Sequence, residues 1–110
     1  MHSNEGRVEV FYNGSWGSIC DYGGGYNDAK VVCRMVGYMS AVRAYEGSTF
    51  GQGSGSVWLD EVECTGDERE LDECAHREYG DVVNCRGHSR DAGVACSGKV
   101  VTSRPFFKPP

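Results

Sequence analysis

Residues 7–20 read RVEVFYNGSWGSIC, and this stretch decides how the chain begins to fold. In its first half Val8, Val10 and Tyr12 alternate with their neighbours, which is the two-residue period of a β-strand. Asn13-Gly14 then tolerates the positive backbone φ angles of a two-residue turn, and a second run with strand character follows. The stretch therefore predicts a β-hairpin.

The same turn contains the chain's only Asn-x-Ser/Thr sequence, Asn13-Gly14-Ser15. In a secreted protein such a sequence is an acceptor for N-linked glycan. Asn13 is therefore a candidate glycosylation site. The alternative is that the turn alone accounts for the asparagine, because asparagine suits positive φ.

Further elements follow along the chain. Residues 27–37 predict a helix, with Asn27 as its cap, Gly37 at its exit, and one apolar face that includes Cys33. The other expected elements are a strand at 57–62, a short helix at 67–74, a closing strand at 92–96 and a tail at 98–110. The tail contains three prolines, which disfavour its continuing a sheet.

Composition limits the class of protein. The chain has 110 residues, with 11 Lys and Arg against 16 Asp and Glu, so its formal net charge is −5. This is the length of one domain. An acidic chain is a poor candidate for nucleic-acid binding, which needs a basic face. No apolar run approaches the roughly 18 residues that span a bilayer, so we expect membrane association only through a parent chain.

Cysteine usage indicates the compartment. The six cysteines lie at positions 20, 33, 64, 74, 85 and 96, and no two have the close spacing of a zinc or thioredoxin-like site. Disulfides therefore fit better than metal ligation, which predicts a secreted protein or an ectodomain. Spacing alone leaves all 15 pairings open.

Six motifs occur in order along residues 6–96: GRVEV (6–10), WGSICD (16–21), DAKVVCRMVG (28–37), FGQGSG (50–55), WLDEVECTG (58–66) and DAGVAC (91–96). Together they resemble the scavenger receptor cysteine-rich domain family, in its six-cysteine group A. Each motif alone is weak, but the whole set in this order is specific. The resemblance covers nearly the full domain.

The resemblance implies an α+β fold, in which a curved antiparallel sheet cradles one main helix and a short second helix accompanies it. It also implies three disulfides, namely Cys20–Cys85, Cys33–Cys96 and Cys64–Cys74. On this basis residues 1–5 are a linker, 6–97 the domain and 98–110 a tail.

The sequence departs from the family pattern at its beginning. Members usually start with a short strand before the Gly6-Arg7-Val8 segment, and only five residues precede it here. The missing strand would leave a sheet edge unpaired. We expect Lys99-Val100-Val101-Thr102 or a second molecule to fill that edge, and the second case predicts a homodimer by edge-strand completion.

The resemblance further implies a cation site. In calcium-binding members an acidic pair after the second-strand cysteine joins a glutamate, and the corresponding residues are Asp21, Tyr22 and Glu68. Because a phenol cannot replace the second carboxylate, calcium would be held weakly by Asp21 and Glu68, and no cofactor is required. The alternative is that Asp21 caps a turn and Glu68 caps its helix.

Polyanion binding is a second implication of the resemblance. Its basic candidates are Arg69, Arg77, Arg86 and Arg90, with His76 and His88 nearby in sequence. Arginine suits sulfate and phosphate because its planar guanidinium donates two parallel hydrogen bonds. The alternative is that these arginines pair with the interleaved acidic residues Glu70, Glu73, Glu78 and Asp81.

No catalytic motif stands out, so the sequence predicts no enzyme. The resemblance implies an extracellular ligand-binding module for polyanionic ligands (microbial surfaces, sulfated glycans, modified lipoproteins) or protein ligands, with calcium as an assisting ion. The alternative is a non-binding structural or oligomerisation module of a larger secreted or membrane protein.

Overall fold

The computed structural model describes residues 4–21, 25–82, 85, 87–98 and 107–108. Strands β1 (Glu5–Tyr12) and β2 (Ser15–Ile19) pair antiparallel as the predicted hairpin. Between them Asn13 and Gly14 have φ angles of 50° and 85°. Both lie in the left-handed region that this turn requires, so the hairpin prediction is confirmed.

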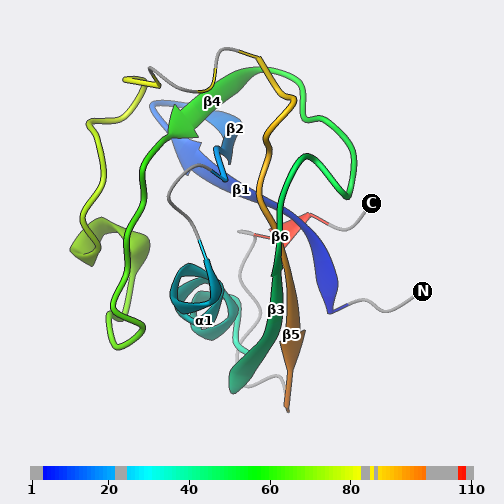
Figure 1. The fold of residues 1–110 in the computed structure, drawn as a ribbon. Helices are drawn as coiled ribbons and strands as arrows, with labels where there is room; N and C mark the ends of the chain where they lie inside the picture. Colours follow the sequence, from blue (N-terminus) through cyan, green and yellow to red (C-terminus); the bar gives the residue numbers. More distant parts are fainter. Residues whose placement is uncertain (1–3, 22–24, 83–84, 86, 99–106, 109–110) are drawn as a thin grey trace.

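One curled sheet runs through the molecule (Figure 1). Its strand order is β3-β5-β1-β2-β4, and β6 also pairs with β1. The additional strands are β3 (Ser40–Tyr45), β4 (Ser56–Leu59), β5 (Gly93–Ser97) and β6 (Phe107–Lys108). The expected curved sheet is present, but it is mixed rather than wholly antiparallel, because β2 and β4 run parallel. Strand β3 was not predicted from the sequence.

Helix α1 (Tyr26–Met35) packs against β3 and β5, as Figure 1 shows. It begins at Tyr26 with Gly25 as N-cap and no side-chain cap, so the prediction that Asn27 caps it was wrong. The Asp28 side chain, in the first turn of α1, binds outside the helix, where its Oδ1 accepts the Cys64 N–H at 2.8 Å. Gly37 follows the helix with a φ of 101°, which fits the expected exit.

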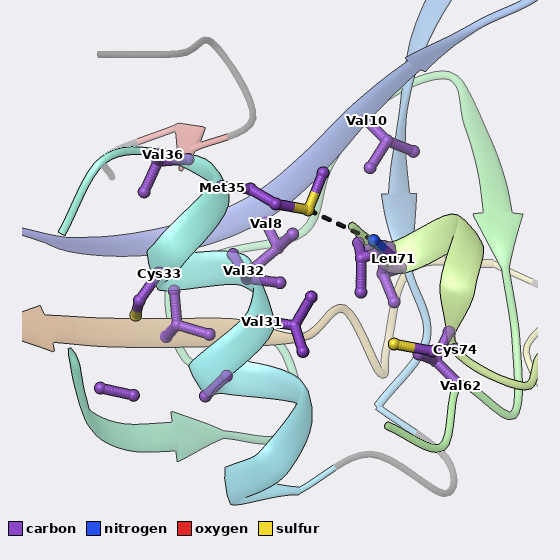
Figure 2. Close-up of a cluster of buried hydrophobic side chains, with 14 of the residues drawn as sticks. Val8, Val10, Val31, Val32, Cys33, Met35, Val36, Val62, Leu71 and Cys74 are labelled. Atoms are coloured by element: carbon purple, nitrogen blue, oxygen red, sulfur yellow. Dashed lines mark hydrogen bonds between the residues drawn. The ribbon is translucent and has the colours of Figure 1, made fainter. Parts of the chain in front are cut away.

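The buried face of α1 forms the centre of the core (Figure 2). Val31 and Cys33 are completely buried there. Val62 and Leu71 reach this core from segments that follow β4, although neither lies in a strand. The Leu71 N–H contacts the Met35 Sδ at 3.4 Å, which ties the loop beyond β4 to the helix.

Three disulfides connect the described residues, and they are the pairs that the resemblance implies. Cys33–Cys96 joins α1 to β5 across 63 residues of sequence. Cys20–Cys85 joins the end of β2 to a loop, and Cys64–Cys74 closes a short segment of 10 residues. The cross-links therefore hold both the sheet–helix layer and the loops beyond β4.

Two expected elements are shorter than predicted. Strand β4 ends at Leu59, because Glu61 has a φ of 54°, which no strand residue adopts. The helix expected at 67–74 is reduced to a single 3-10 turn, η1 (Leu71–Glu73). The preceding residues form a turn instead, because the Glu68 side chain accepts hydrogen bonds from the backbone just before it.

The tail behaves differently from the expectation. Phe107–Lys108 pairs with Arg7 and Val8 of β1, although three prolines disfavoured a further strand. The segment expected to fill the sheet edge, residues 99–102, lies outside the described residues. Within the described part of the chain, no helix has the length and apolar character needed to cross a bilayer.

Candidate functional site

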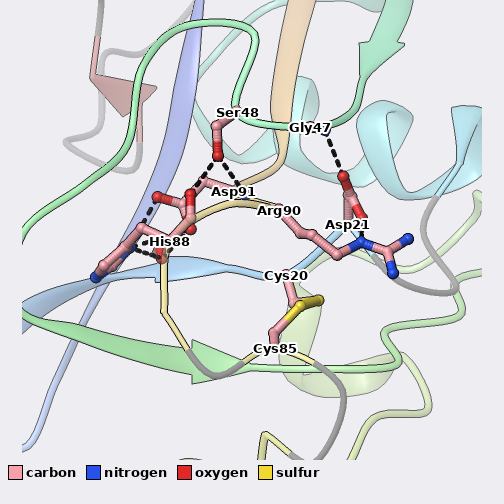
Figure 3. Close-up of a disulfide and its surroundings, with 9 residues drawn as sticks. Cys20, Asp21, Gly47, Ser48, Cys85, His88, Arg90 and Asp91 are labelled. Atoms are coloured by element: carbon pink, nitrogen blue, oxygen red, sulfur yellow. Dashed lines mark hydrogen bonds and ion pairs between the residues drawn. A yellow bond between two sulfur atoms is a disulfide. The ribbon is translucent and has the colours of Figure 1, made fainter.

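Asp21 follows β2 directly, and the chain at Arg90 runs beside it. Cys20 forms an antiparallel bridge with Asp91, and the Asp21 N–H donates to the Arg90 carbonyl at 2.8 Å. These backbone contacts place the Arg90 side chain at Asp21, where its Nε donates to Oδ1 at 2.9 Å (Figure 3). The structure thus joins a predicted cation ligand and a predicted anion-binding arginine in one ion pair, here called the Asp21–Arg90 pair.

The two partners differ in exposure. The Asp21 side chain is 5% exposed and that of Arg90 is 47% exposed. The second carboxylate oxygen, Oδ2, accepts the Gly47 N–H at 2.5 Å. Asp21 is therefore held from two sides, and it anchors the guanidinium of a half-exposed arginine side chain.

Glu68, the other predicted cation ligand, closes a backbone turn. Its carboxylate accepts the N–H groups of Thr65 at 2.8 Å and Gly66 at 2.9 Å. These hydrogen bonds, with that from Thr65 the largest, lower the pKa of Glu68 to about 2. Arg34 braces the same turn by donating to the Gly66 carbonyl at 2.9 Å. The side chain therefore caps a turn, though not the helix that the sequence predicted.

The carboxylates of Asp21 and Glu68 share no hydrogen-bond partner among the described residues. Asp21 is already compensated by a guanidinium, and Tyr22 lies outside the described residues. Two further groupings, Cys20–Asp60–Cys85 and Cys64–Glu68–Cys74, depend on cysteines that are in disulfides and cannot act as thiolate ligands. A calcium ion at Asp21 would have to compete with Arg90, so calcium binding stays a prediction.

Two of the remaining arginine candidates, Arg69 and Arg77, lie in separate ion pairs. Arg69 lies 3.8 Å from Glu73, and Arg77 lies 2.9 Å from Asp81. Arg86 lies outside the described residues. Partners of this kind match the alternative interpretation, in which interleaved acidic residues neutralise the arginines. Exposed pairs of this type contribute only about 0–1 kcal/mol.

A buried polar network, which the sequence did not predict, lies next to the Asp21–Arg90 pair. The Asp91 side chain is 1% exposed, accepts the Ser18 hydroxyl at 2.7 Å and the Gly53 N–H at 2.7 Å, and lies 2.8 Å from the His88 Nδ1. These contacts tie the Gly- and Ser-rich loop to β2. We call Ser18, His88 and Asp91 the Ser18–His88–Asp91 network. From the sequence, His88 was named only as lying near the arginine candidates, and Ser18 and Asp91 only within family motifs.

These three residue types form catalytic triads elsewhere, but this geometry differs. In a triad the imidazole contacts serine with one nitrogen and aspartate with the other. Here Ser18 and Asp91 both approach Nδ1, while Nε2 lies 2.8 Å from the Gly55 carbonyl. Ser18 is 1% exposed and donates its proton to Asp91. The hydroxyl is neither activated nor accessible, so the network is structural.

The imidazole of His88 faces acceptors with both nitrogens. Burial lowers the pKa of His88, and the nearby positive charge of Arg7 lowers it further. The hydrogen bonds to the Gly55 carbonyl and the Asp91 carboxylate, with the negative charge of Asp91, raise it by more. The net result is a pKa raised above 6.5. The protonated ring, which donates from both nitrogens, is therefore the form that the fold prefers.

This preference gives a pH dependence of stability with a definite sign. Because the folded pKa is raised, the stabilisation is complete below 6.5 and is lost as pH rises through the folded value. We expect the difference in free energy of unfolding between wild type and His88→Gln to be larger at about pH 6 than at about pH 8. Urea denaturation at both values measures it. Asp28, whose pKa burial raises to about 6, titrates in both proteins and cancels. Parallel pH profiles would contradict the assignment.

The hairpin turn presents the predicted glycosylation site. Asn13 is exposed at its tip. Glycosylation of Asn13 stays a prediction.

Comparison with known proteins identifies the family. A family model described as "Scavenger receptor cysteine-rich domain" matches residues 1–97. The chain belongs to this family. Scavenger receptor cysteine-rich (SRCR) domains are generally non-enzymatic modules and are typically extracellular or parts of ectodomains.

Several relatives and solved structures are similar to this SRCR domain. Galectin-3-binding protein of Mus musculus is 52% identical over 95 residues, covering 86% of this chain and 16% of the relative. Lysyl oxidase homolog 2 of Gallus gallus is 46% identical over 105 residues, covering 96% of this chain and 13% of the relative. The dimeric form of the SRCR domain of mouse MARCO superposes with a TM-score of 0.78 at 48% identity, covering 88% of this chain and 91% of that one.

This SRCR domain spans only 8% to 16% of the length of such curated relatives. They include a scavenger receptor cysteine-rich domain superfamily protein of Patiria pectinifera, 50% identical over 96 residues and matched over 87% of this chain. Occurrence of the family in scavenger-receptor and binding-protein contexts supports a ligand-binding extracellular module in general.

Proposed function

We propose that this SRCR domain recognises polyanionic or protein ligands at the face around the Asp21–Arg90 pair, without doing chemistry. The observation that carries the proposal is the half-exposed Arg90 side chain, whose guanidinium is held by a buried carboxylate. The ligand would contribute sulfate, phosphate or carboxylate groups.

The physical argument is preorganisation. A flexible surface arginine loses side-chain entropy when it binds, whereas Arg90 is already fixed through its Nε. Its planar guanidinium suits paired oxygens of an anionic group. A net charge of −5 opposes polyanions at long range, so recognition depends on such local basic groups.

Calcium belongs to this proposal as an assisting ion. Asp21 and Glu68 would hold it, and it would supply positive charge toward an anionic ligand. Because the Arg90 guanidinium already binds the Asp21 carboxylate, a calcium ion would compete with Arg90 for that carboxylate. Ligand binding with and without chelator therefore separates arginine-based from calcium-assisted recognition.

A solid-phase assay with immobilised dextran sulfate tests the proposal on the whole chain. We expect Arg90→Ala to weaken binding about tenfold, since a charged hydrogen-bond donor is lost. Arg69→Ala is the matched control, because the Arg69 side chain is 86% exposed and its Nε lies 3.8 Å from an exposed carboxylate of Glu73. Equal binding by both variants, or no binding of the wild type to any anionic or protein probe, would contradict the proposal.

The alternative function is a structural or oligomerisation module. Strand β3 is an edge of the sheet in the described residues, and the nearby Met39 and Val42 are 70% and 59% exposed. A second molecule could complete this edge, whereas the homodimer expected from the sequence used the edge left by the missing strand before Gly6. Capture of a defined partner chain without binding of anionic probes would favour this function.

A further inference from the structure

A groove lies between the end of β1 and η1, and it shares no residue with the Asp21–Arg90 pair. Its volume is about 180 Å³. The apolar side chains that line it include Val10, Met35 and Leu71 (Figure 2). All three are nearly buried and belong to the core, so this part of the groove is rigid. Pockets for drug-sized ligands run from about 300 Å³, so the groove has the size for one side chain.

Aromatic rings line the groove near the hairpin. Phe11 is 57% exposed, and Tyr12 stacks on Tyr79 with ring centroids 4.0 Å apart and an angle of 14° between the rings. Trp58 meets the Tyr12 ring edge-on at 5.2 Å, and Trp16 meets Phe11 at 5.4 Å. These contacts fix the rings before any ligand arrives. The electron-rich faces of such rings attract cations.

Carboxylates lie beside the rings. Glu70 and Asp72 both line the groove and are exposed, and the Tyr79 hydroxyl donates to Asp72. Burial, followed by the contact with Asp72, raises the pKa of Tyr79, which keeps this hydroxyl a donor. Among the described residues that line the groove, none is Lys, Arg or His. The groove therefore combines apolar, aromatic and negative surfaces.

We propose that this groove binds an arginine side chain from a basic segment of a partner protein. The aliphatic stem would lie on the apolar residues, and the planar guanidinium would stack on an aromatic ring and donate hydrogen bonds to Glu70 and Asp72. Lysine fits less well, because its compact ammonium is strongly hydrated and cannot stack. Anionic ligands are repelled by the two carboxylates. The proposal goes beyond the function assigned to the Asp21–Arg90 pair, which has the opposite charge preference.

The probe is the peptide acetyl-Gly-Arg-Gly-amide, titrated into the ¹⁵N-labelled whole chain with its disulfides intact. We expect amide resonance shifts at residues 10–12, 70–72 and 79, with a dissociation constant of about 1 mM. The matched peptide with citrulline in place of arginine keeps the shape and removes the charge. It is expected to bind about fivefold more weakly, as is the lysine peptide.

Variants locate the site. The double substitution Glu70→Gln with Asp72→Asn is expected to weaken the arginine peptide about fivefold. The double substitution Glu63→Gln with Asp67→Asn is the matched control, because both residues are also exposed, their substitution removes the same two charges, and neither lines the groove. Equal weakening by the control would mean that only net charge matters, and it would overturn the proposal.

Two other ligands of the groove would give different results in the same titration. Choline chloride binding as tightly as the arginine peptide would overturn the assignment to arginine, because choline offers no hydrogen-bond donor on its ammonium group. Shifts at these residues that depend on protein concentration without peptide would assign the groove to a second copy of the chain instead. Binding to dextran sulfate does not enter this test, so its failure and that of the proposed function remain distinguishable.

Discussion

Replacing Cys33 and Cys96 together by alanine is expected to lower the free energy of unfolding by about 4 kcal/mol. The disulfide closes 63 residues of sequence, and freeing such a loop returns a large conformational entropy to the unfolded chain. Both cysteines are completely buried between α1 and β5, so their removal also loosens the packing of helix on sheet. Urea denaturation, followed by circular dichroism, measures the loss.

The short disulfide provides the comparison. Cys64–Cys74 closes only 10 residues, so replacing both cysteines by alanine should cost about 3 kcal/mol by the same relation. If the two double variants lose equal stability, or if the Cys33–Cys96 variant loses less, loop entropy is not what these cross-links contribute. Total stability of a small domain is only about 5–15 kcal/mol, so the longer cross-link carries a large share of it.

Asp91→Ala is expected to cost about 3–5 kcal/mol, the second large effect. The carboxylate is buried and accepts from Ser18 and Gly53 while facing His88. Alanine leaves a buried hydroxyl, a backbone N–H and an imidazole without their acceptor at once, and each lost partner carries a desolvation cost. The free energy of unfolding, measured near neutral pH, reports the sum.

Asp91→Asn separates charge from hydrogen bonding at this position. Asparagine keeps one acceptor oxygen but points an amide donor toward groups that also donate, so an intermediate loss is expected. Glu78→Gln, at an exposed carboxylate, is the control and should change stability by less than about 0.5 kcal/mol. A loss for Asp91→Ala as small as that of the control would show that the network does not hold the loop to β2.

Parts of the fold that depend on neighbouring residues could be predicted from the sequence. The hairpin around Asn13 and Gly14 was readable because turn preference and strand alternation act between neighbouring residues. Helix α1 was readable from its apolar period, although its cap was not. Gly25 is its N-cap and no side chain caps it, while the Asp28 carboxylate in its first turn accepts the distant Cys64 N–H.

The ends of two predicted elements were wrong. Acidic residues at the start of 67–74 favour a helix locally, yet Glu68 turns back to the N–H groups of Thr65 and Gly66. The strand predicted through Val62 stops early because Glu61 adopts positive φ. Neither feature is marked in the apolar period, which is the signal from which these elements were predicted.

By itself the sequence determined a disulfide-rich, hairpin-led domain of the SRCR family, because composition, turn chemistry and ordered motifs are properties of the chain alone. Only the tertiary structure decided that Asp21 meets Arg90, 69 residues away, and that Ser18 meets Asp91, 73 residues away. It also decided that aromatic rings from β1 and carboxylates beside η1 line one groove. The physical reason is that local rules fix φ, ψ and side-chain period, whereas contacts between distant residues depend on the packing of the whole chain.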